Sequence, residues 1–244
     1  MTPPARHTDA LLEQLLRRGD IWRGQSQSAA PQTALDTGHA PLNEALLHKG
    51  WPLATLVEIH QELAGQGEWL LLTPALRRLT AGYTVLLNPP ALPFAAGLIQ
   101  LGLDLDRLLV VQASSKPDFL AGFLELARSP ICAALLAWQP KHNLSYTELR
   151  KCLLAANESR GLRLLFRPAR VQQQSSPAVL RLATKLHSRA LELHIFKQKG
   201  WLGAAASRPL QLPLPETWMP LAPYGQLDQS SAAESQPDLR WSKP

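Results

Sequence analysis

Short apolar runs alternate with longer amphipathic segments through the middle of this chain. The continuous apolar runs suit strands that are buried on both faces, and the segments between them repeat their apolar positions at helical spacing. This alternation predicts an α/β fold with a mostly parallel sheet, helices on its faces and right-handed crossovers. The predicted strands are Thr55–His60, Thr84–Asn88, Arg107–Gln112, Ala133–Trp138 and Arg163–Arg167. The predicted helices are Glu68–Thr80, Pro93–Leu101, Pro117–Arg128 and Ser145–Ser159, with a shorter helix that opens at Pro41.

The pattern changes towards the C-terminal end. Ala178–Leu186 and Ala190–Lys197 alternate apolar and polar residues and are separated by a short polar turn. A period of two predicts an antiparallel hairpin added to the edge of the sheet. Leu210–Leu214 is a further predicted edge strand, because the prolines in and around it limit its pairing.

A single domain is predicted between two polar ends. Residues 1–32 hold a short helix, Asp9–Arg18, and a linker, and residues 33–224 form the α/β domain. Residues 225–244 are rich in Ser, Gln, Asp and Pro, a composition that predicts disorder. At 244 residues and 45% hydrophobic content, the chain can bury a sizeable core.

The charge and the cysteine content exclude few classes of protein. The formal net charge of +6 permits contact with nucleic acid or an acidic protein and identifies neither. Cys132 and Cys152 lie in apolar contexts without C-x-x-C spacing, so we expect buried thiols and neither a metal site nor a disulfide. Residues 1–20 have no apolar signal region, and no run reaches the roughly 20 apolar residues that span a bilayer. We therefore expect a cytoplasmic protein with no membrane contact.

The turn after the first long strand has the outline of a phosphate-binding loop without its reactive groups. A phosphate-binding loop reads G-x-x-x-x-G-K-[ST], in which the Lys contacts phosphates and the hydroxyl holds Mg²⁺. Here the turn reads Gly65-Gln66-Gly67-Glu68-Trp69, with no Lys and no hydroxyl. A carboxylate stands where a nucleotide would bring negative charge. We expect no functional Walker motif and no cofactor.

The order of elements resembles the RecA-like core from about Thr33 to Lys199. Leu35–Ile59 looks like the entry of RecA and RadA, and Leu86–Gln112 resembles the next RecA segment without a gap. Leu124–Trp138 resembles the stretch that ends in the magnesium-binding aspartate of RecA. The resemblance implies a RecA-like core of mostly parallel sheet.

The same resemblance places the catalytic groups of RecA at residues that lack their chemistry. The glutamate that activates the hydrolytic water falls at Pro90, and the magnesium aspartate falls at Trp138. The phosphate lysine has no counterpart near Gly67 and Glu68. General-base and metal roles need an ionisable or ligating side chain. We therefore expect no ATPase activity, with a residual nucleotide sensor as the rival interpretation.

Several short motifs lie before and within the predicted domain. They are Ile21–Gly24, Gly50–Pro52, Pro89–Phe94, Gly102–Leu109 and Phe166–Pro168 followed by Ser176–Ala178. Together they resemble the ImuA family. The resemblance implies a non-catalytic accessory protein of SOS-induced mutagenic translesion synthesis after DNA damage, with ImuB, an error-prone C-family DNA polymerase alpha subunit and RecA as partners. The related SulA family, whose shorter members inhibit cell division by binding FtsZ, is the alternative.

Basic and aromatic residues gather on and beside the predicted hairpin. This combination suits single-stranded DNA, through phosphate neutralisation and base stacking, or a partner protein. Charged residues also protect an exposed edge strand from pairing, and both interpretations stay open. Tryptophans in polar C-terminal sequence suit anchoring to a partner. The candidate contacts are Lys185, Arg189, Phe196, Lys197, Lys199, Trp201 and Trp241.

Two further sets of polar residues have a functional and a plain interpretation. Glu58 and His60 share one face of a strand, as a catalytic pair or as the polar end of a buried strand. Four arginines cluster after the last predicted helix, where they would bind phosphates or lie on a solvated edge. They are Arg160, Arg163, Arg167 and Arg170.

Overall fold

The chain folds as a mixed α/β domain around one large sheet. The computed structural model describes residues 33–200 and 208–215. The predicted helix Asp9–Arg18, its linker and the predicted disordered tail 225–244 lie outside the described residues. No helix within the described residues is both long and apolar enough to cross a membrane.

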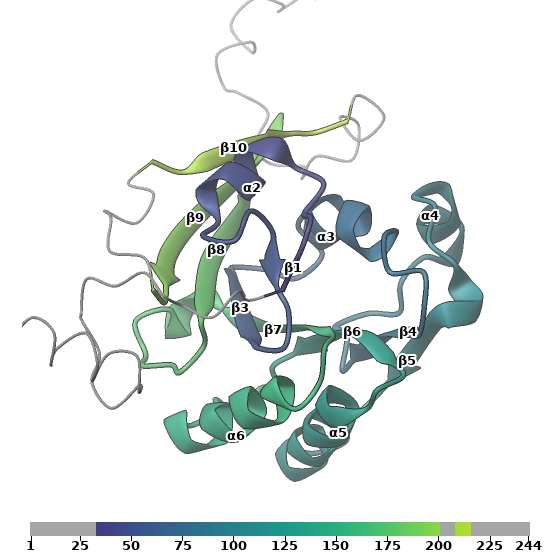
Figure 1. Cartoon of the computed structure of the whole chain (residues 1–244), viewed down its shortest axis with the longest axis vertical. Coiled ribbons are helices and arrows are strands. Elements are labelled where there is room, and N and C mark those ends of the chain that lie inside the picture. The colour runs from purple at the N-terminus through teal and green to yellow at the C-terminus, as the bar shows by residue number, and fades with distance from the viewer. Residues whose placement is uncertain (1–32, 201–207, 216–244) are drawn as a thin grey trace, which may run out of the picture.

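The large sheet has eight strands in the order β10-β9-β8-β3-β7-β6-β4-β5 (Figure 1). Six neighbouring strands from β8 to β5 run parallel, and β9 and β10 add antiparallel strands beside β8. The predicted parallel sheet and its C-terminal hairpin are therefore confirmed. The strands are β3 (Leu56–Gln61), β4 (Tyr83–Leu87), β5 (Leu108–Val111), β6 (Cys132–Trp138), β7 (Leu162–Pro168), β8 (Leu180–Leu186), β9 (Ala190–Gln198) and β10 (Leu210–Pro213).

Helices cover both faces of the parallel part of the sheet, as Figure 1 shows with α5 and α6 together on one side. Serine hydroxyls cap the N-termini of both: Ser115 accepts from the Asp118 N–H in α5, and Ser145 with Glu148 forms a capping box in α6. The helices are α2 (Ala40–Ala45), α3 (Glu68–Leu76), α4 (Ala95–Gln100), α5 (Lys116–Arg128) and α6 (Tyr146–Asn157). Two 3-10 turns, η1 (Leu105–Arg107) and η2 (Ala169–Val171), complete the described helical structure.

Two apolar cores lie on opposite faces of the sheet. Val57 and Ile59 of β3 belong to the core beneath α2 and α3, whereas Leu56 belongs to the core beneath α5 and α6. Alternate residues of a strand point to opposite faces, so a strand buried on both faces must be apolar throughout. Cys132 and Cys152 are buried free thiols in the second core, as predicted. Burial raises the pKa of Cys152 to about 12, which keeps it a protonated thiol.

A two-stranded antiparallel sheet was not predicted. It pairs β1 (Ala34–Leu35) with β2 (Trp51–Pro52) on either side of α2. Strands of two residues are too short to show a period of two. The completely buried Trp51 fixes this unit to the core beneath α2 and α3.

Pro74 lies inside α3 and leaves one carbonyl of the helix without its usual donor. Proline has no N–H, so the C=O of Leu70, four residues earlier, loses its helical partner. The imidazole Nε2 of His39 lies 3.1 Å from that carbonyl oxygen and replaces the missing donor. Burial lowers the pKa of His39, so at neutral pH this donor is the neutral Nε2–H tautomer.

Gly38 makes that arrangement sterically feasible. Its φ of +80° lies in the left-handed region, and a Cβ there would come within 2.2 Å of the Pro74 Cβ. Only glycine fits both conditions without strain. The helix therefore continues through Pro74 and ends at Leu76, earlier than the predicted Thr80.

The repair predicts a specific double-mutant cycle. His39→Ala should lower the free energy of unfolding by about 1 kcal/mol, because the Leu70 carbonyl then lacks a donor. In a Pro74→Ala background the alanine N–H supplies that donor, so the same change at His39 should cost much less. Urea unfolding of the four proteins measures both values. Equal costs of His39→Ala in the two backgrounds would contradict the repair.

Candidate functional site

A cleft of about 440 Å³ opens at the carboxyl ends of four central strands, β3, β4, β6 and β7. In open α/β sheets, ligands bind outside the carboxyl ends of strands whose following helices leave towards opposite faces. Here α3 follows β3 on one face and α6 follows β6 on the other. The cleft is therefore at the position where this fold class places a ligand.

Aromatic and proline side chains form the walls of the cleft. Trp138 stacks on Phe166 with ring centroids 4.6 Å apart and planes 13° apart. Pro89 and Pro90 lie across from them, directly after Asn88, whose φ of +57° is in the left-handed region. Pro90 and Trp138, which the RecA resemblance aligned with the catalytic glutamate and the magnesium aspartate, thus line the same cleft.

The side chains of Trp, Phe and Pro neither ligate a metal ion nor take up a proton. Glu62, Lys141, Arg167 and Arg170 supply the ionisable groups of the lining. No group of three or more His, Cys, Asp or Glu residues suited to a metal ion occurs within the described ranges. The cleft is chemically suited to an apolar or aromatic group, with cations at its rim.

The turn that leads into α3 is occupied by the carboxylate of Glu68. Its Oε1 accepts a hydrogen bond of 2.6 Å from the Gly65 N–H and one of 2.9 Å from the Gln61 amide. Backbone N–H groups of such a turn are the donors that bind phosphate in a nucleotide site. The protein's own carboxylate takes a donor that a phosphate would need, and its charge also suits the N-terminus of a helix.

A network of buried charges lies deeper in the domain, around Glu58 of β3. The sequence left open a catalytic pair with His60 or polar residues at the end of a buried strand. The strand is buried as the second interpretation expects, but Glu58 lies in the middle of β3 and not at its end. The Glu58 carboxylate accepts hydrogen bonds from two arginines: from Nη1 of Arg167 on β7, at 3.3 Å, and from Nε of Arg181 on β8, at 2.8 Å. His60 Nε2 at 3.1 Å and the Ser176 hydroxyl at 2.5 Å complete its partners.

The network sets the charge state of Glu58. Burial alone would raise its pKa, but the His60 hydrogen bond, Arg167, the Ser176 hydroxyl and Arg181 together lower it to about 2. Because Glu58 is ionised, His60 donates its Nε2–H to the carboxylate, which leaves the buried Nδ1 without a hydrogen-bond partner among the described residues. The network around Glu58 therefore links three strands by buried ion pairs, and neither Glu58 nor His60 is exposed to a substrate.

The four predicted arginines separate into buried and exposed pairs. Arg160 and Arg170 are exposed, whereas Arg163 and Arg167 are fully buried, so the prediction of one phosphate-binding or solvated cluster is wrong for the latter two. Arg163 donates to the carbonyls of Ala127 and Cys132 at 3.1 and 2.9 Å. Burial lowers the pKa of Arg163, and these hydrogen bonds join α5 to the start of β6.

Two of the candidate contact residues on the hairpin, Phe196 and Lys197, instead make contacts within the domain. The pairing of β8 with β9 skips Phe196, which is the extra residue of a β-bulge. Its half-buried ring meets His60 edge-on at 5.3 Å, and the Arg181 guanidinium lies 4.9 Å from its centroid. Lys197 Nζ donates to the Ser176 carbonyl at 2.6 Å.

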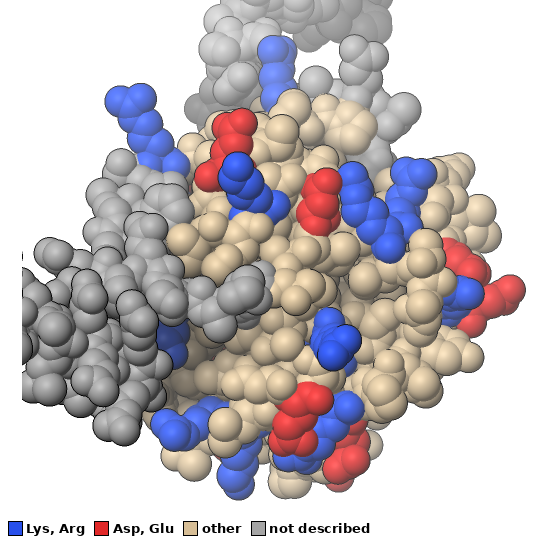
Figure 2. All heavy atoms as spheres, viewed as in Figure 1, with Lys and Arg blue, Asp and Glu red and all other residues tan. Residues whose placement is uncertain are grey.

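The remaining candidates divide by exposure. Lys185, Arg189 and Lys199 are exposed and available to a ligand. Trp201 and Trp241 lie outside the described residues. On the face seen in Figure 2, Lys and Arg side chains are scattered among uncharged and acidic residues.

Arg181 is the functional residue of the network that the sequence did not reveal. It lies between Leu180 and Leu182 in an alternating strand, where a charged residue is ordinarily solvent-facing. The signal that could have found it was the unpaired acid of Glu58 in an apolar strand, since a buried carboxylate requires a cation.

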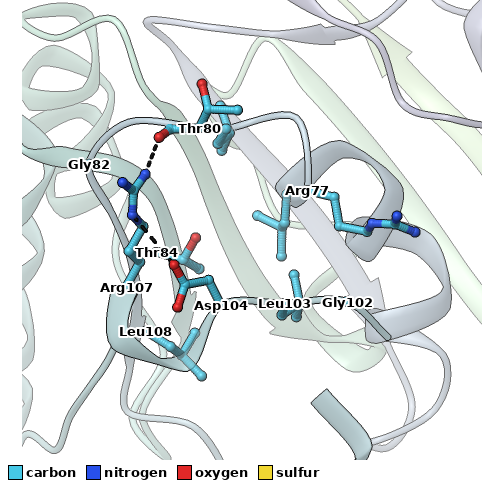
Figure 3. A pocket seen from close by; sticks show the side chains of 11 residues that line it. Arg77, Thr80, Gly82, Thr84, Gly102, Leu103, Asp104, Arg107 and Leu108 are labelled. Carbon is cyan, nitrogen blue, oxygen red and sulfur yellow. Dashed lines mark hydrogen bonds and ion pairs between the residues drawn. The ribbon is translucent and has the colours of Figure 1, made fainter. Parts of the chain in front are cut away.

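A second cavity, of about 300 Å³, lies at the opposite end of the sheet between α3 and the starts of β4 and β5 (Figure 3). Arg107 there donates to the Thr80 carbonyl and pairs with Asp104 at 3.6 Å. The side chain of Arg77 points away from this pair in Figure 3. The cation that faces the cavity is thus already neutralised, and we do not assign a ligand to it.

Comparisons with known proteins found solved structures that are similar to this chain. No protein-family model matches the chain, and no curated protein matches it. The chain is similar to SulA from Pseudomonas aeruginosa, with 27% identity and a TM-score of 0.38. The match covers 48% of this chain and 99% of that one. The similarity extends over about half of this chain, and a TM-score of this size adds no argument about function.

The occupied turn predicts a stability effect at Glu68. Glu68→Ala should lower the free energy of unfolding by about 1–3 kcal/mol, because the Gly65 N–H and the Gln61 amide lose their acceptor. Glu68→Gln keeps an acceptor oxygen and should cost less. Glu62→Ala, an exposed neighbour, is the matched control and should change stability by less than about 0.5 kcal/mol. Urea unfolding measures all three, and a silent Glu68→Ala variant would contradict the role of the carboxylate.

The lowered pKa of Glu58 predicts acid sensitivity. A carboxylate with a folded-state pKa of about 2 and an unfolded value near 4.5 stabilises the fold above pH 4.5. That contribution, about 3 kcal/mol, is lost as the pH falls from 4.5 to 2.

Glu58→Gln tests this dependence. The variant should be less stable by about 3–5 kcal/mol at pH 6, because Arg167 and Arg181 lose their counterion. The difference from the natural protein should shrink as the pH falls towards 2. Urea unfolding across that range measures it, and two parallel pH profiles would exclude Glu58 as the titrating group.

Proposed function

We propose that this chain is a non-catalytic accessory protein of SOS-induced mutagenic translesion DNA synthesis, built on a degenerate RecA-like core. It acts in the cytoplasm through contacts with ImuB, an error-prone C-family DNA polymerase alpha subunit and RecA. The motifs that resemble ImuA support the choice of partners. The state of the phosphate-binding turn supports the absence of catalysis.

The observation that carries the proposal is the position of Glu68. A nucleotide would need the Gly65 N–H that Glu68 already occupies, and its phosphates would meet a carboxylate at close range. Two like charges in a partly buried turn repel strongly, because the local dielectric constant is lower than that of water. The turn therefore favours a stable loop over a nucleotide site.

The cleft supports the same conclusion. The side chains of Pro90 and Trp138 fill the positions that the RecA resemblance assigns to water activation and magnesium binding. Hydrolysis of a phosphoanhydride requires a positioned base and a metal ion. Trp138 and Phe166 instead stack on each other and are buried, so they stabilise this end of the sheet.

The exposed cations of the hairpin supply a surface for contacts. Lys185, Arg189 and Lys199 remain free of the buried network that holds Phe196 and Lys197. Such cations attract single-stranded DNA or an acidic partner, and their contribution falls with rising salt. The proposal uses these three residues and not the whole candidate set.

The purified full chain should bind purified ImuB together with the polymerase alpha subunit. The triple variant Lys185→Glu, Arg189→Glu, Lys199→Glu should weaken this binding, or binding to single-stranded DNA, at least about tenfold. The variant Lys49→Glu, Arg150→Glu, Lys151→Glu changes the net charge equally at three other exposed residues and should bind normally. Surface immobilisation of ImuB at two salt concentrations measures the affinities.

Two control titrations separate the rival functions. Calorimetry with Mg²⁺-ATP should give no binding heat, and purified FtsZ should polymerise normally when the chain is added. Binding of ATP would overturn the non-catalytic proposal. Inhibition of FtsZ polymerisation without ImuB binding would replace the proposed role by that of a division inhibitor.

A further inference from the structure

The edge strand β5 exposes apolar side chains on both faces of the sheet. Leu109 points to the side of α5 and Val110 to the side of α4, as their register with β4 shows. They remain 43% and 39% exposed. A continuous Leu-Leu-Val-Val strand is typical of the interior of a parallel sheet, where both neighbours and both faces are covered.

The two edges of the sheet differ in their protection. β10, at one edge, contains Pro213 and exposes Gln211. Proline and polar side chains are the usual devices that prevent an edge strand from pairing with another chain. β5, at the other edge, has neither proline nor charge. An unprotected apolar edge of this kind is a template for another strand.

The segment beside β5 extends the apolar surface. Leu92, Phe94 and Ile99, before and within α4, are 77%, 78% and 60% exposed. No charged residue occurs in 88–103 or within β5, although the exposed Asp104, Asp106 and Arg107 lie between them in the chain. Figure 2 shows mostly uncharged surface over α4, with charged side chains directly beside it. Together with Leu109 and Val110, these side chains expose on the order of 500 Å² of apolar surface, with Leu109 on the other face of the sheet from Val110.

We propose that a second copy of this chain binds here, with the two β5 strands paired antiparallel across a two-fold axis. The two eight-stranded sheets would then form one continuous sheet. The exposed residues of both α4 segments would cover the join. The inference goes beyond the proposed function, since it does not depend on any partner in DNA synthesis.

Self-association is favoured by the symmetry and the chemistry of the surface. Antiparallel pairing of identical edge strands is isologous, so each copy supplies the same donors and acceptors. An interface with an apolar centre and charged residues only at its rim, as Asp106 and Arg107 would be here, is typical of homodimers. Two such surfaces would bury about 1,000 Å² before the main-chain hydrogen bonds are counted, which reaches the lower limit of specific interfaces.

The segments outside the described residues are poor in residues that favour a strand. Residues 1–32, 201–207 and 216–244 together contain one Val or Ile residue, Ile21. β-Branched aliphatic residues are those that favour a strand. A second β5 is therefore a better complement to the edge than any of these segments.

The backbone of β5 provides a selective test. The Val111 carbonyl accepts from the Asn88 N–H on the β4 side, so by alternation the Val110 N–H faces the open edge. Val110→Pro removes that outward donor and leaves the pairing with β4 intact. Leu109→Lys places a charge at the same edge by a different route.

Sedimentation equilibrium of the purified full chain should give a dimer. Val110→Pro and Leu109→Lys should each weaken dimerisation at least about tenfold, with circular dichroism and urea unfolding used to confirm the fold. Leu154→Lys on α6 is the matched control, because it charges a residue that is equally exposed (51%) away from this edge, and should stay dimeric.

Two results would overturn the proposal. A monomer at every concentration would exclude a second copy, and binding of ImuB lost in the same edge variants would then assign the surface to that partner. A dimer that persists in both edge variants would place the dimer interface elsewhere. Both readouts are independent of ATP and DNA binding, so they are distinct from the tests of the proposed function.

Discussion

The ion pairs of Glu58 join three neighbouring strands of the sheet, β7, β3 and β8, and most other features of the structure depend on these pairs. Glu58 lies on β3, and its two arginines come from the neighbouring strands β7 and β8 on either side. A buried carboxylate without cations would be strongly destabilising, and so would either arginine alone. The three strands are therefore held in one register, since a shift by one residue would move each charged side chain to the opposite face.

This constraint also explains how the C-terminal hairpin is attached. Arg181 is shared between Glu58 and the ring of Phe196, and Lys197 holds the Ser176 carbonyl of the preceding loop. The bulge at Phe196 lets two successive residues of β9 reach the same network. The basic and aromatic residues that suggested a ligand surface thus form two groups. Phe196 and Lys197 make contacts within the domain, and Lys185, Arg189 and Lys199 are exposed.

The protein's own side chains supply partners at both ends of the α3 region. Glu68 accepts from the Gly65 N–H at the turn before α3, and Trp138 and Phe166 stack at the carboxyl end of the sheet. The His39 ring similarly replaces the donor that Pro74 removes from α3.

The sequence by itself determined the alternation of strands and helices, the C-terminal hairpin and the buried thiols. Strands buried on both faces, such as Cys132–Trp138, must be continuous apolar runs, and that signal is local. The sequence also shows directly that the turn before α3 has no lysine. It does not show the hydrogen bond from the Gly65 N–H to Glu68, which only the structure reveals.

The tertiary structure decided the roles of the charged residues. Arg163, Arg167 and Arg181 look like solvent-facing cations along the chain, yet they are buried because their partners come from distant segments. The open edge at β5 was also invisible, since an apolar strand predicts burial and only the order of strands shows that one side is left uncovered. The periodicity of a sequence shows which residues share a face of a strand or helix. Only the packing of segments that are distant in sequence decides whether that face contacts apolar residues, charged partners or solvent.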